Sequence, residues 1–241
     1  MLDSALCRRI VLAAIDIDGT LTRARDDVRL VPESIEVVDL LESNGVMASL
    51  MTGNSLPVAA GLSKYLGSRG PVIAENGCVV FHEDRIYHVC SGRPPLSLVE
   101  EIKGLGFRES WQNAFRFHEY ALIPPGGYEG LVERAIEMAR SRGYNAIWTG
   151  YALHIQPPGG GKLKGLSAAL ELVGASLEDV IAFGDGDNDV EVLSAVPFSA
   201  SPGDASPRAK SSATYVASLP GARGVLEAVR AFIECRSRPT L

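Results

Sequence analysis

The sequence predicts an α/β fold in which a doubly wound, Rossmann-like parallel sheet carries an inserted α+β cap domain. Short, unbroken apolar runs alternate with helical patterns near both ends of the 241-residue chain. Such runs are typical of strands that are buried on both faces of a parallel sheet. A middle stretch has a different rhythm and is bounded by two segments rich in proline and glycine. We expect the core to span 1–86 and 158–241, and the cap to span 87–157.

The first third of the chain predicts the strand–helix repeat that builds a parallel sheet. Residues 10–15 form an apolar run that ends at Asp16, and a proline that favours a helix start begins the next segment. The pattern predicts strands over 10–15, 46–51 and 71–74, and helices over 32–43 and 55–66.

The inserted stretch mixes helical and strand-like patterns, as an α+β module does. A hairpin over 78–80 and 85–89 precedes a linker at 91–95, and a second break at 157–161 closes the insert. We expect the cap to hold helices over 96–105 and 128–142, and strands over 116–123, 146–148 and 152–155.

The parallel rhythm resumes after the second break. The pattern predicts strands over 180–183, 198–199 and 215–217, and helices over 163–173, 190–193 and 221–233.

Composition narrows the function classes. Hydrophobic residues make up 46% of the chain and charged residues 22%, which is ordinary for a folded globular protein. A net charge of −6 does not favour binding to nucleic acid. The apolar run after Arg8 and Arg9 is six residues long, far short of the roughly 20 that span a membrane. We therefore expect a cytoplasmic protein without a membrane or nucleic-acid partner.

Four cysteines, Cys7, Cys78, Cys90 and Cys235, show neither a CxxC pair nor the spacing of a zinc site. The expected state is free intracellular thiols. Disulfides remain an alternative if the source is a hyperthermophile, and the sequence does not choose the pairs.

Polar clusters stand where core strands end or helices begin. They are 16–20 (DIDGT), 52–54 (TGN), Lys162 with Lys164, and 184–189 (GDGDND). The carboxyl ends of parallel strands meet at one edge of the sheet, which is where open α/β sheets bind their ligands. Three or more carboxylates at that edge repel one another unless a hard dication lies among them, and such oxygen ligands suit Mg²⁺.

These clusters resemble the four motifs of the haloacid dehalogenase superfamily of phosphatases, in the same order. The insert lies between the second and third motifs, as in members with a C2-type cap. Within the superfamily, DIDGTLT, TGNSLP and GPVIAENG are most similar to archaeal-type phosphoglycolate phosphatases. The resemblance covers the core, and the cap adds little to it.

The resemblance implies a role for each matching residue. Asp16 would be the nucleophile that forms an aspartyl-phosphate, and Asp18 the general acid and then base. Mg²⁺ would be held by Asp16, the main-chain carbonyl of Asp18, and Asp185, with Asp189 bound directly or through a water. The phosphoryl group would be bound by Thr52, Gly53, Lys164 and Asn188.

One departure concerns the third motif. The family often has an acidic residue before the motif lysine, and Leu163 stands there in this chain. Lys162 is therefore a weaker rival of Lys164 for contact with the phosphoryl group.

The function that follows is hydrolysis of a phosphate monoester on a small phosphorylated metabolite, with 2-phosphoglycolate as the first candidate. Sugar phosphates and phosphoglycerate derivatives are alternatives, as are a phosphomutase and a non-catalytic module that binds a phosphorylated ligand. A substrate that bears a carboxylate needs a cation from the cap, for which Arg116 is the candidate. The oligomeric state is left open, with a homodimer as one candidate.

Overall fold

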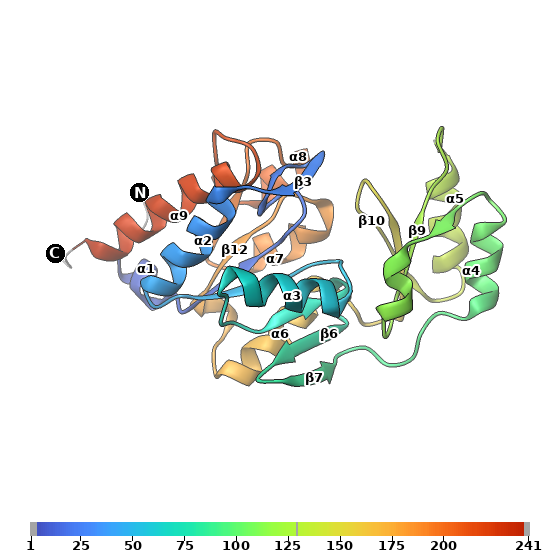
Figure 1. Ribbon diagram of the computed structural model, residues 1–241, viewed down its shortest axis with the longest axis horizontal. Helices are drawn as coiled ribbons and strands as arrows, with labels where there is room; N and C mark the ends of the chain where they lie inside the picture. The colour runs from blue at the N-terminus through green and yellow to red at the C-terminus, as the bar shows by residue number, and fades with distance from the viewer. Residues whose placement is uncertain (1–3, 129, 239–241) are drawn as a thin grey trace.

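The computed structural model describes residues 4–128 and 130–238. Figure 1 shows a core, which carries α1 and α9 at the end away from the cap, and a cap that contains α4, α5 and β9. The strand order in the core sheet is β14-β13-β12-β1-β4, and every neighbouring pair is parallel. These strands are β1 (Leu12–Ile15), β4 (Met47–Leu50), β12 (Val180–Phe183), β13 (Phe198–Ser201) and β14 (Tyr215–Val216). The predicted fold class is confirmed.

Strand register brings the predicted site segments to one edge. Ile15 at the end of β1 lies opposite Phe183 of β12 and Leu50 of β4. The next residues of all three strands therefore emerge together, with the Asp16 N–H donating to the Phe183 carbonyl at 2.9 Å. The sheet thus aligns the first, second and fourth motifs without any contribution from the cap.

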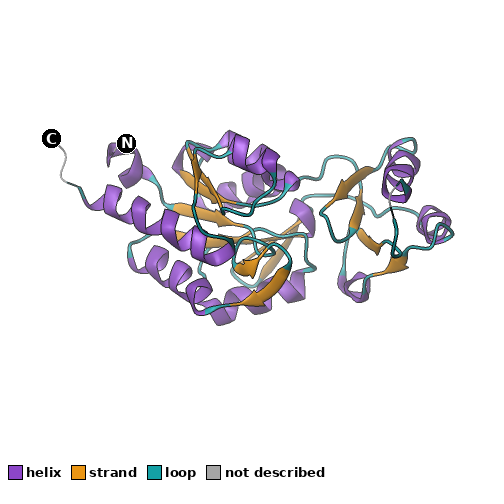
Figure 2. Ribbon diagram, turned by 90° about the horizontal axis from the view of Figure 1, so that it is seen from above, coloured by secondary structure: helices purple, strands orange, loops and turns teal. Residues whose placement is uncertain are grey.

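Helices cover both faces of the core sheet, as Figure 2 shows. Ala13 and Ile15 of β1 pack toward one face, while Leu12 and Ala14 pack toward the other, because successive strand residues point to opposite sides. On the first face lie α1 (Ser4–Arg9), α2 (Pro32–Ser43) and α9 (Gly221–Ser237); on the second lie α6 (Lys162–Val173), α7 (Val190–Ala195) and α8 (Pro207–Ser212). The remaining core helix, α3 (Leu56–Leu66), packs beside β4 and β5.

An antiparallel sheet extends the core next to β4. It contains β5 (Val72–Ala74), β6 (Val79–His82) and β7 (Arg85–His88), and a parallel bridge between Met51 and Ile73 joins it to the main sheet. The predicted hairpin is β6–β7. A second hairpin, β2 (Thr22–Ala24) with β3 (Asp27–Leu30), was not predicted, nor were α1 and α8.

The cap is a four-stranded antiparallel sheet of order β10-β11-β9-β8 with two helices. Its elements are α4 (Leu96–Lys103), β8 (Arg108–Glu109), β9 (Tyr120–Ile123), α5 (Leu131–Arg140), β10 (Asn145–Trp148) and β11 (Leu153–Gln156). Leu98, Leu122 and Leu153 are fully buried in a separate hydrophobic cluster. The strand predicted from 116 begins only at Tyr120, after a 3₁₀ turn at Trp111–Phe115. Residue 129, inside the predicted helix 128–142, lies outside the described residues.

The prediction of free thiols is wrong. Disulfides join Cys7 to Cys235 and Cys78 to Cys90, and none of the four cysteines is free. The first links α1 to α9, which pack together although 228 positions separate the two cysteines. The second bridges residues on either side of the β6–β7 hairpin. The first pair forms through long-range packing, which residue spacing does not reveal, whereas the second follows from the local hairpin.

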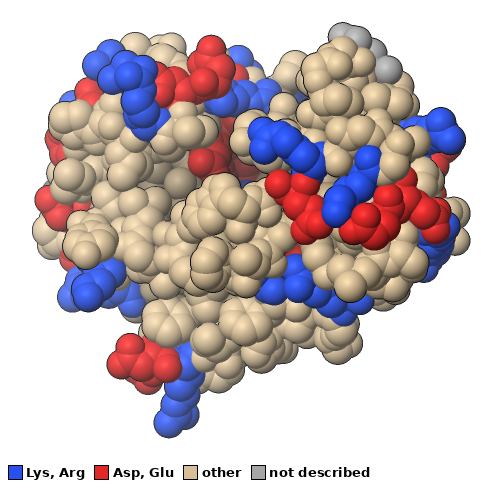
Figure 3. Space-filling view, turned by 45° about the vertical axis from the view of Figure 1, so that its right-hand side comes forward, with Lys and Arg blue, Asp and Glu red and all other residues tan. Residues whose placement is uncertain are grey.

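Among residues 4–128 and 130–238, none of the helices combines the length and the apolar character that a membrane span requires. On the face drawn in Figure 3, Lys and Arg side chains are interspersed with Asp and Glu side chains. That face therefore lacks the continuous basic area that a phosphate backbone favours.

Candidate active site

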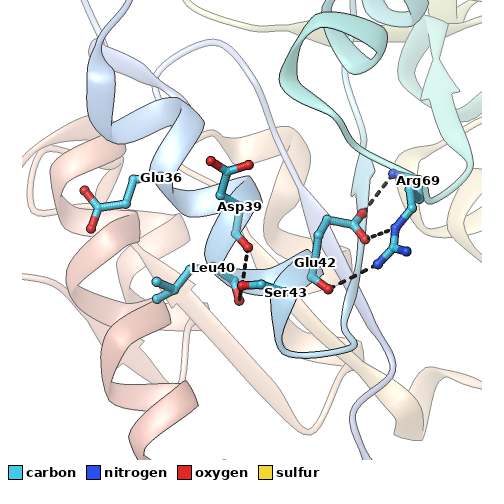
Figure 4. A pocket seen from close by; sticks show the side chains of 6 residues that line it. All are labelled: Glu36, Asp39, Leu40, Glu42, Ser43 and Arg69. Carbon is cyan, nitrogen blue, oxygen red and sulfur yellow. Dashed lines mark hydrogen bonds and ion pairs between the residues drawn. The ribbon is translucent and has the colours of Figure 1, made fainter.

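Two concavities in the described part of the chain are candidates for the functional site. One lies beside α2 and is lined by Glu36, Asp39, Leu40, Glu42, Ser43 and Arg69. Its one cationic group is already engaged, because the guanidinium of Arg69 pairs with the Glu42 carboxylate at 2.6 Å (Figure 4). None of the four polar clusters reaches it, so it is not the candidate site.

The second concavity is a cleft of about 490 Å³ between the core and the cap. Core residues Asn76, Lys162 and Asn188 line it together with Arg140 and Trp148 of the cap. The volume suits a small metabolite. Lys162 of the third polar cluster and Asn188 of the fourth therefore face this cleft.

Three buried carboxylates converge beside the cleft. Asp16 follows β1, Asp185 follows β12, and Asp189 ends a 3₁₀ turn at Asp187–Asp189. Each offers one carboxylate oxygen, and these oxygens lie within 4.8 Å of one another. The structure thus brings together the three side chains that the sequence predicts as metal ligands.

Lys162, rather than Lys164, reaches these acids. Its Nζ lies 2.6 Å from Asp16 Oδ1 and 2.6 Å from Asp189 Oδ1, and its side chain is buried. Lys164 is exposed and makes no hydrogen bond or ion pair with any residue that the structure describes. Because α6 begins at Lys162, the two lysines point about 200° apart around the helix axis. The placement of Lys164 at the site is therefore corrected to Lys162.

The mutual repulsion of Asp16, Asp185 and Asp189 is only partly offset by the positive charge of Lys162. Burial raises the pKa of Asp16 well above its usual range, and the charge of Asp189 adds to this effect against the opposing Lys162. Burial and the charge of Asp189 raise the pKa of Asp185 to about 6. A divalent cation would relieve this repulsion.

The donor set around the acids fits such an ion. All the candidate ligands are oxygens, as Mg²⁺ prefers. Thr20 Oγ1 donates to Asp185 Oδ1 at 3.0 Å, and Arg25 Nε lies 3.2 Å from Asp185 Oδ2, so the carboxylate is held in place from outside the cluster. These outer contacts are of the kind that orient the ligands of metal sites.

Gly19 is required by the close packing of this cluster. Its φ of +88° lies in the left-handed region, and a Cβ placed there would lie 2.4 Å from Asp185 Oδ2. Only glycine meets both conditions without displacing the carboxylate. The glycine of the first motif therefore allows β1 and β12 to present their acids together.

Asp18 lies apart from the three acids. Its carboxylate accepts a hydrogen bond from Asn54 Nδ2 at 2.6 Å, and the same amide nitrogen lies 3.1 Å from Thr52 Oγ1. The residue is exposed to solvent. Desolvation by the surrounding protein nevertheless raises the pKa of Asp18, while the Asn54 hydrogen bond acts in the opposite sense. A carboxyl group with a raised pKa is suited to carry a proton.

The second motif is connected directly to the cap. Gln112 Nε2 donates to Asn54 Oδ1 at 2.8 Å, and its Oε1 accepts from the Ser55 N–H at 2.7 Å. Gln112 was missed, because nothing in the sequence distinguishes it from other surface amides.

Asn188, which the sequence predicts at the site, lies beside the loop after β5. Its Nδ2 donates to Asn76 Oδ1 at 3.3 Å.

Glu75 forms a second connection to the cap. Its buried carboxylate accepts hydrogen bonds from three consecutive main-chain N–H groups of the cap, those of Phe117 at 2.8 Å, His118 at 2.9 Å and Glu119 at 3.2 Å. Glu75 has a φ of 51°, a conformation uncommon for residues other than glycine. Backbone strain of this kind persists where surrounding contacts impose it. The segment GPVIAENG contained this residue, but its role was not predicted.

A buried ionic cluster in the cap covers the second motif. Arg116 donates to the Gly53 carbonyl at 2.9 Å and pairs with Glu119, whose carboxylate also lies 2.8 Å from His154 Nδ1. All three side chains are buried. Arg116, the candidate for binding a substrate carboxylate, is thus already paired with an anion of the cap.

Sequence comparison relates this site to known proteins. The family model of haloacid dehalogenase-like hydrolases matches residues 13–92 and 132–229. A phosphoglycolate phosphatase of Aeropyrum pernix is 55% identical, over 93% of this chain and 94% of the relative. Phosphoglycolate phosphatase 1 of Saccharolobus solfataricus is 36% identical, over 91% of this chain and 94% of the relative.

Solved structures share the fold. A crystal structure of a Thermoplasma acidophilum protein superposes with a TM-score of 0.83 at 27% identity, covering 93% of this chain and 98% of that one. A haloacid dehalogenase-like hydrolase from Bacteroides thetaiotaomicron has a TM-score of 0.74 at 20% identity, covering 92% and 99%. The family model spans the elements that position Asp16, Lys162 and Asp185. The chain belongs to the haloacid dehalogenase-like hydrolase family.

Proposed function

We propose that the chain is a Mg²⁺-dependent phosphate-monoester hydrolase that acts through an aspartyl-phosphate, with 2-phosphoglycolate as its substrate. The observation that carries the proposed reaction is the convergence of Asp16, Asp185 and Asp189, with Lys162 ion-paired to the first and third. The proposed substrate is supported by relatives at 55% and 36% identity that are named phosphoglycolate phosphatases.

In the first step a carboxylate oxygen of Asp16 attacks phosphorus, and the bond from phosphorus to the leaving oxygen breaks. Asp18 gives that oxygen its proton, which its raised pKa allows it to hold. In the second step water attacks the phosphorus of the aspartyl-phosphate and passes a proton to Asp18. Phosphate leaves, and the Asp16 carboxylate is restored.

Other residues hold the transferring group. Lys162 lies against the nucleophile, so its charge offsets the negative charge that gathers there. Thr52 Oγ1 lies beside Asn54, which in turn binds Asp18, so one segment of chain contacts both the phosphoryl site and the proton donor. These hydrogen bonds hold the hydroxyl of Thr52 and the carboxylate of Asp18 at a defined distance from each other.

Mg²⁺ would be held by Asp16, Asp185 and the Asp18 main-chain carbonyl, with Asp189 bound directly or through a water. When bound, it would neutralise charge on the phosphoryl oxygens. Asp189 Oδ2 accepts from the Gly186 N–H at 2.9 Å and its Oδ1 is paired with Lys162, so both of its oxygens already have partners. These partners favour the water-mediated role for Asp189.

The experiment that tests the proposed function is a phosphate-release screen over phosphorylated metabolites, with and without Mg²⁺. We expect the highest kcat/KM for 2-phosphoglycolate, ahead of phosphoglycerates and sugar phosphates. Release from none of them would overturn the proposal in favour of a binding module, and an isomerised sugar phosphate would indicate a mutase. The cytoplasmic location and the homodimer stay predictions.

Lys162→Met is expected to reduce kcat by about 10²- to 10³-fold, because it removes the cation that faces both Asp16 and Asp189. Lys164→Met is the matched control, since the same change two residues along α6 affects an exposed side chain. Its kcat is expected to stay within about 2-fold of wild type. Steady-state phosphate release measures both, and equal losses would contradict the assignment of Lys162.

Removing divalent cations with excess chelator is expected to abolish phosphate release, and added Mg²⁺ to restore it. Mg²⁺ at 100 times its Kd is also expected to stabilise the wild type by about 2.7 kcal/mol, because the ion binds only the folded chain. Asp185→Asn should lose most of this stabilisation, as seen by thermal unfolding. Turnover that persists in chelator would count against the proposed cofactor.

A further inference from the structure

We propose that His154 recognises the leaving group of the substrate, with its Nε2 bound to the carboxylate of 2-phosphoglycolate and with Glu119 and Arg116 as positioning residues. The inference rests on the proposed function and deepens it. It assigns a specificity role to the cap, whereas the proposed chemistry uses residues of the core.

The position of His154 places it over the phosphoryl-binding segment. It lies on β11 of the cap and is 6% exposed. Its Cε1 would lie 3.3 Å from a Cβ built on Gly53, so the imidazole packs directly against the second motif. Burial raises the pKa of Asp18, while the Asn54 hydrogen bond, Lys162 and, least, His154 act in the opposite sense. His154 is thus near the residue that protonates the leaving oxygen.

The orientation of the imidazole leaves one nitrogen available. Nδ1 lies 2.8 Å from Glu119 Oε1. Burial alone would raise the pKa of Glu119, but the charges of His154 and Arg116 outweigh it and the pKa lies below its usual value. Glu119 is therefore ionised and accepts the Nδ1–H. Nε2 has no hydrogen-bond partner within the described residues.

Charge balance indicates the class of ligand. Arg116 is buried, pairs with Glu119 and donates to the Gly53 carbonyl, so its charge is already matched. A protonated His154 would then leave the cluster with one unmatched positive charge in a buried place. Such a charge is costly unless an anion pairs with it. A carboxylate on the leaving group supplies that anion, and an uncharged leaving group of equal size does not.

Two acidic side chains face this cluster from the core, and burial raises the pKa of each. Glu75 approaches from the loop after β5, but its carboxylate accepts the three main-chain N–H groups at 117–119. Asp18 approaches from the loop after β1 and is bound by Asn54. Neither carboxylate makes a hydrogen bond or ion pair with His154 among the described contacts. The Nε2 side of His154 is therefore available to an anionic group of the substrate.

The test compares 2-phosphoglycolate with ethyl phosphate, which has a similar size and lacks the carboxylate. For the wild type we expect a kcat/KM that favours 2-phosphoglycolate. His154→Asn is expected to reduce this preference about 10- to 100-fold, mainly by raising the KM for 2-phosphoglycolate. Glu119→Gln keeps an acceptor for Nδ1–H but removes the charge, and should lower the preference less.

His118→Asn is the matched control. His118 is also a buried cap histidine, but its ring contacts His88 and the Gly92 carbonyl, away from the cluster. Its substitution should leave the preference for 2-phosphoglycolate unchanged. Thermal unfolding shows which variants fold, and His154→Gln replaces His154→Asn if the latter does not.

The outcomes separate the two proposals. If the wild type releases phosphate from neither compound, the proposed function fails. If it hydrolyses both and His154→Asn lowers the two kcat/KM values equally, or changes neither, the role of His154 is overturned while the proposed function stands. A preference that survives in His154→Asn and is lost in His118→Asn would also overturn it.

Discussion

Asp16→Asn is expected to lower kcat for phosphate release by at least about 10⁴-fold, because an amide cannot serve as the nucleophile that forms the phosphorylated intermediate. The change keeps the size of the side chain and one oxygen near Lys162. Stopped assays with radiolabelled substrate should also find no phosphorylated protein. The kcat of Asp84→Asn, an exposed acid in the β6–β7 turn, should match the wild type.

The same substitution is not expected to lower stability in the absence of metal. The raised pKa of Asp16 means that folding disfavours its charged form, so above the usual pKa of an aspartate the ionised group destabilises the fold. Removing the charge takes away that penalty at neutral pH, while Asp189 still pairs with Lys162. Urea unfolding of the metal-free proteins measures this. A variant less stable than the wild type would contradict this expectation, and a folded variant that keeps its turnover would contradict the assignment of Asp16 as nucleophile.

Reducing the Cys7–Cys235 disulfide is expected to destabilise the protein by about 5 kcal/mol, which corresponds to a fall of about 10–20 °C in Tm. The bond closes a loop of 228 positions, and a long loop restricts the unfolded chain most. Cys78–Cys90 closes only 12 positions, and its reduction should cost about 3 kcal/mol.

Two double variants separate these contributions. Cys78→Ala with Cys90→Ala retains only the long link, and Cys7→Ala with Cys235→Ala retains only the short one. Adding reductant to each during urea unfolding then measures one link at a time, without changing the sequence. Thiol titration of the denatured wild type should find no free thiols before reduction. Four thiols at that stage would instead support the free cysteines that the sequence predicted.

Most of the core was predictable because its strands carry their signal locally. Residues 10–15 and 180–183 are unbroken apolar runs, and the acids that follow them mark the edge where ligands bind. Since register in a parallel sheet aligns these ends, the meeting of Asp16 with Asp185 follows from the sequence pattern.

The choice between Lys162 and Lys164 was not predictable in the same way. Both lie in the first turn of α6, and which of them faces the acids depends on the residue at which the helix begins, which Gly161 sets. Helix boundaries depend on capping geometry and are poorly defined by periodicity. The contacts of Gln112, Glu119 and His154 depend on how the cap docks, which no local pattern encodes.

The hydrogen bonds between Glu75 and the cap affect how the cap sequence can change during evolution. Its carboxylate holds the peptide groups of residues 117–119, not their side chains. Any amino acid except proline presents the same N–H groups. Mutation can therefore change the side chains of this segment while its hydrogen bonds to Glu75 remain. The substrate preference of the cap can then evolve without loss of its attachment to the core.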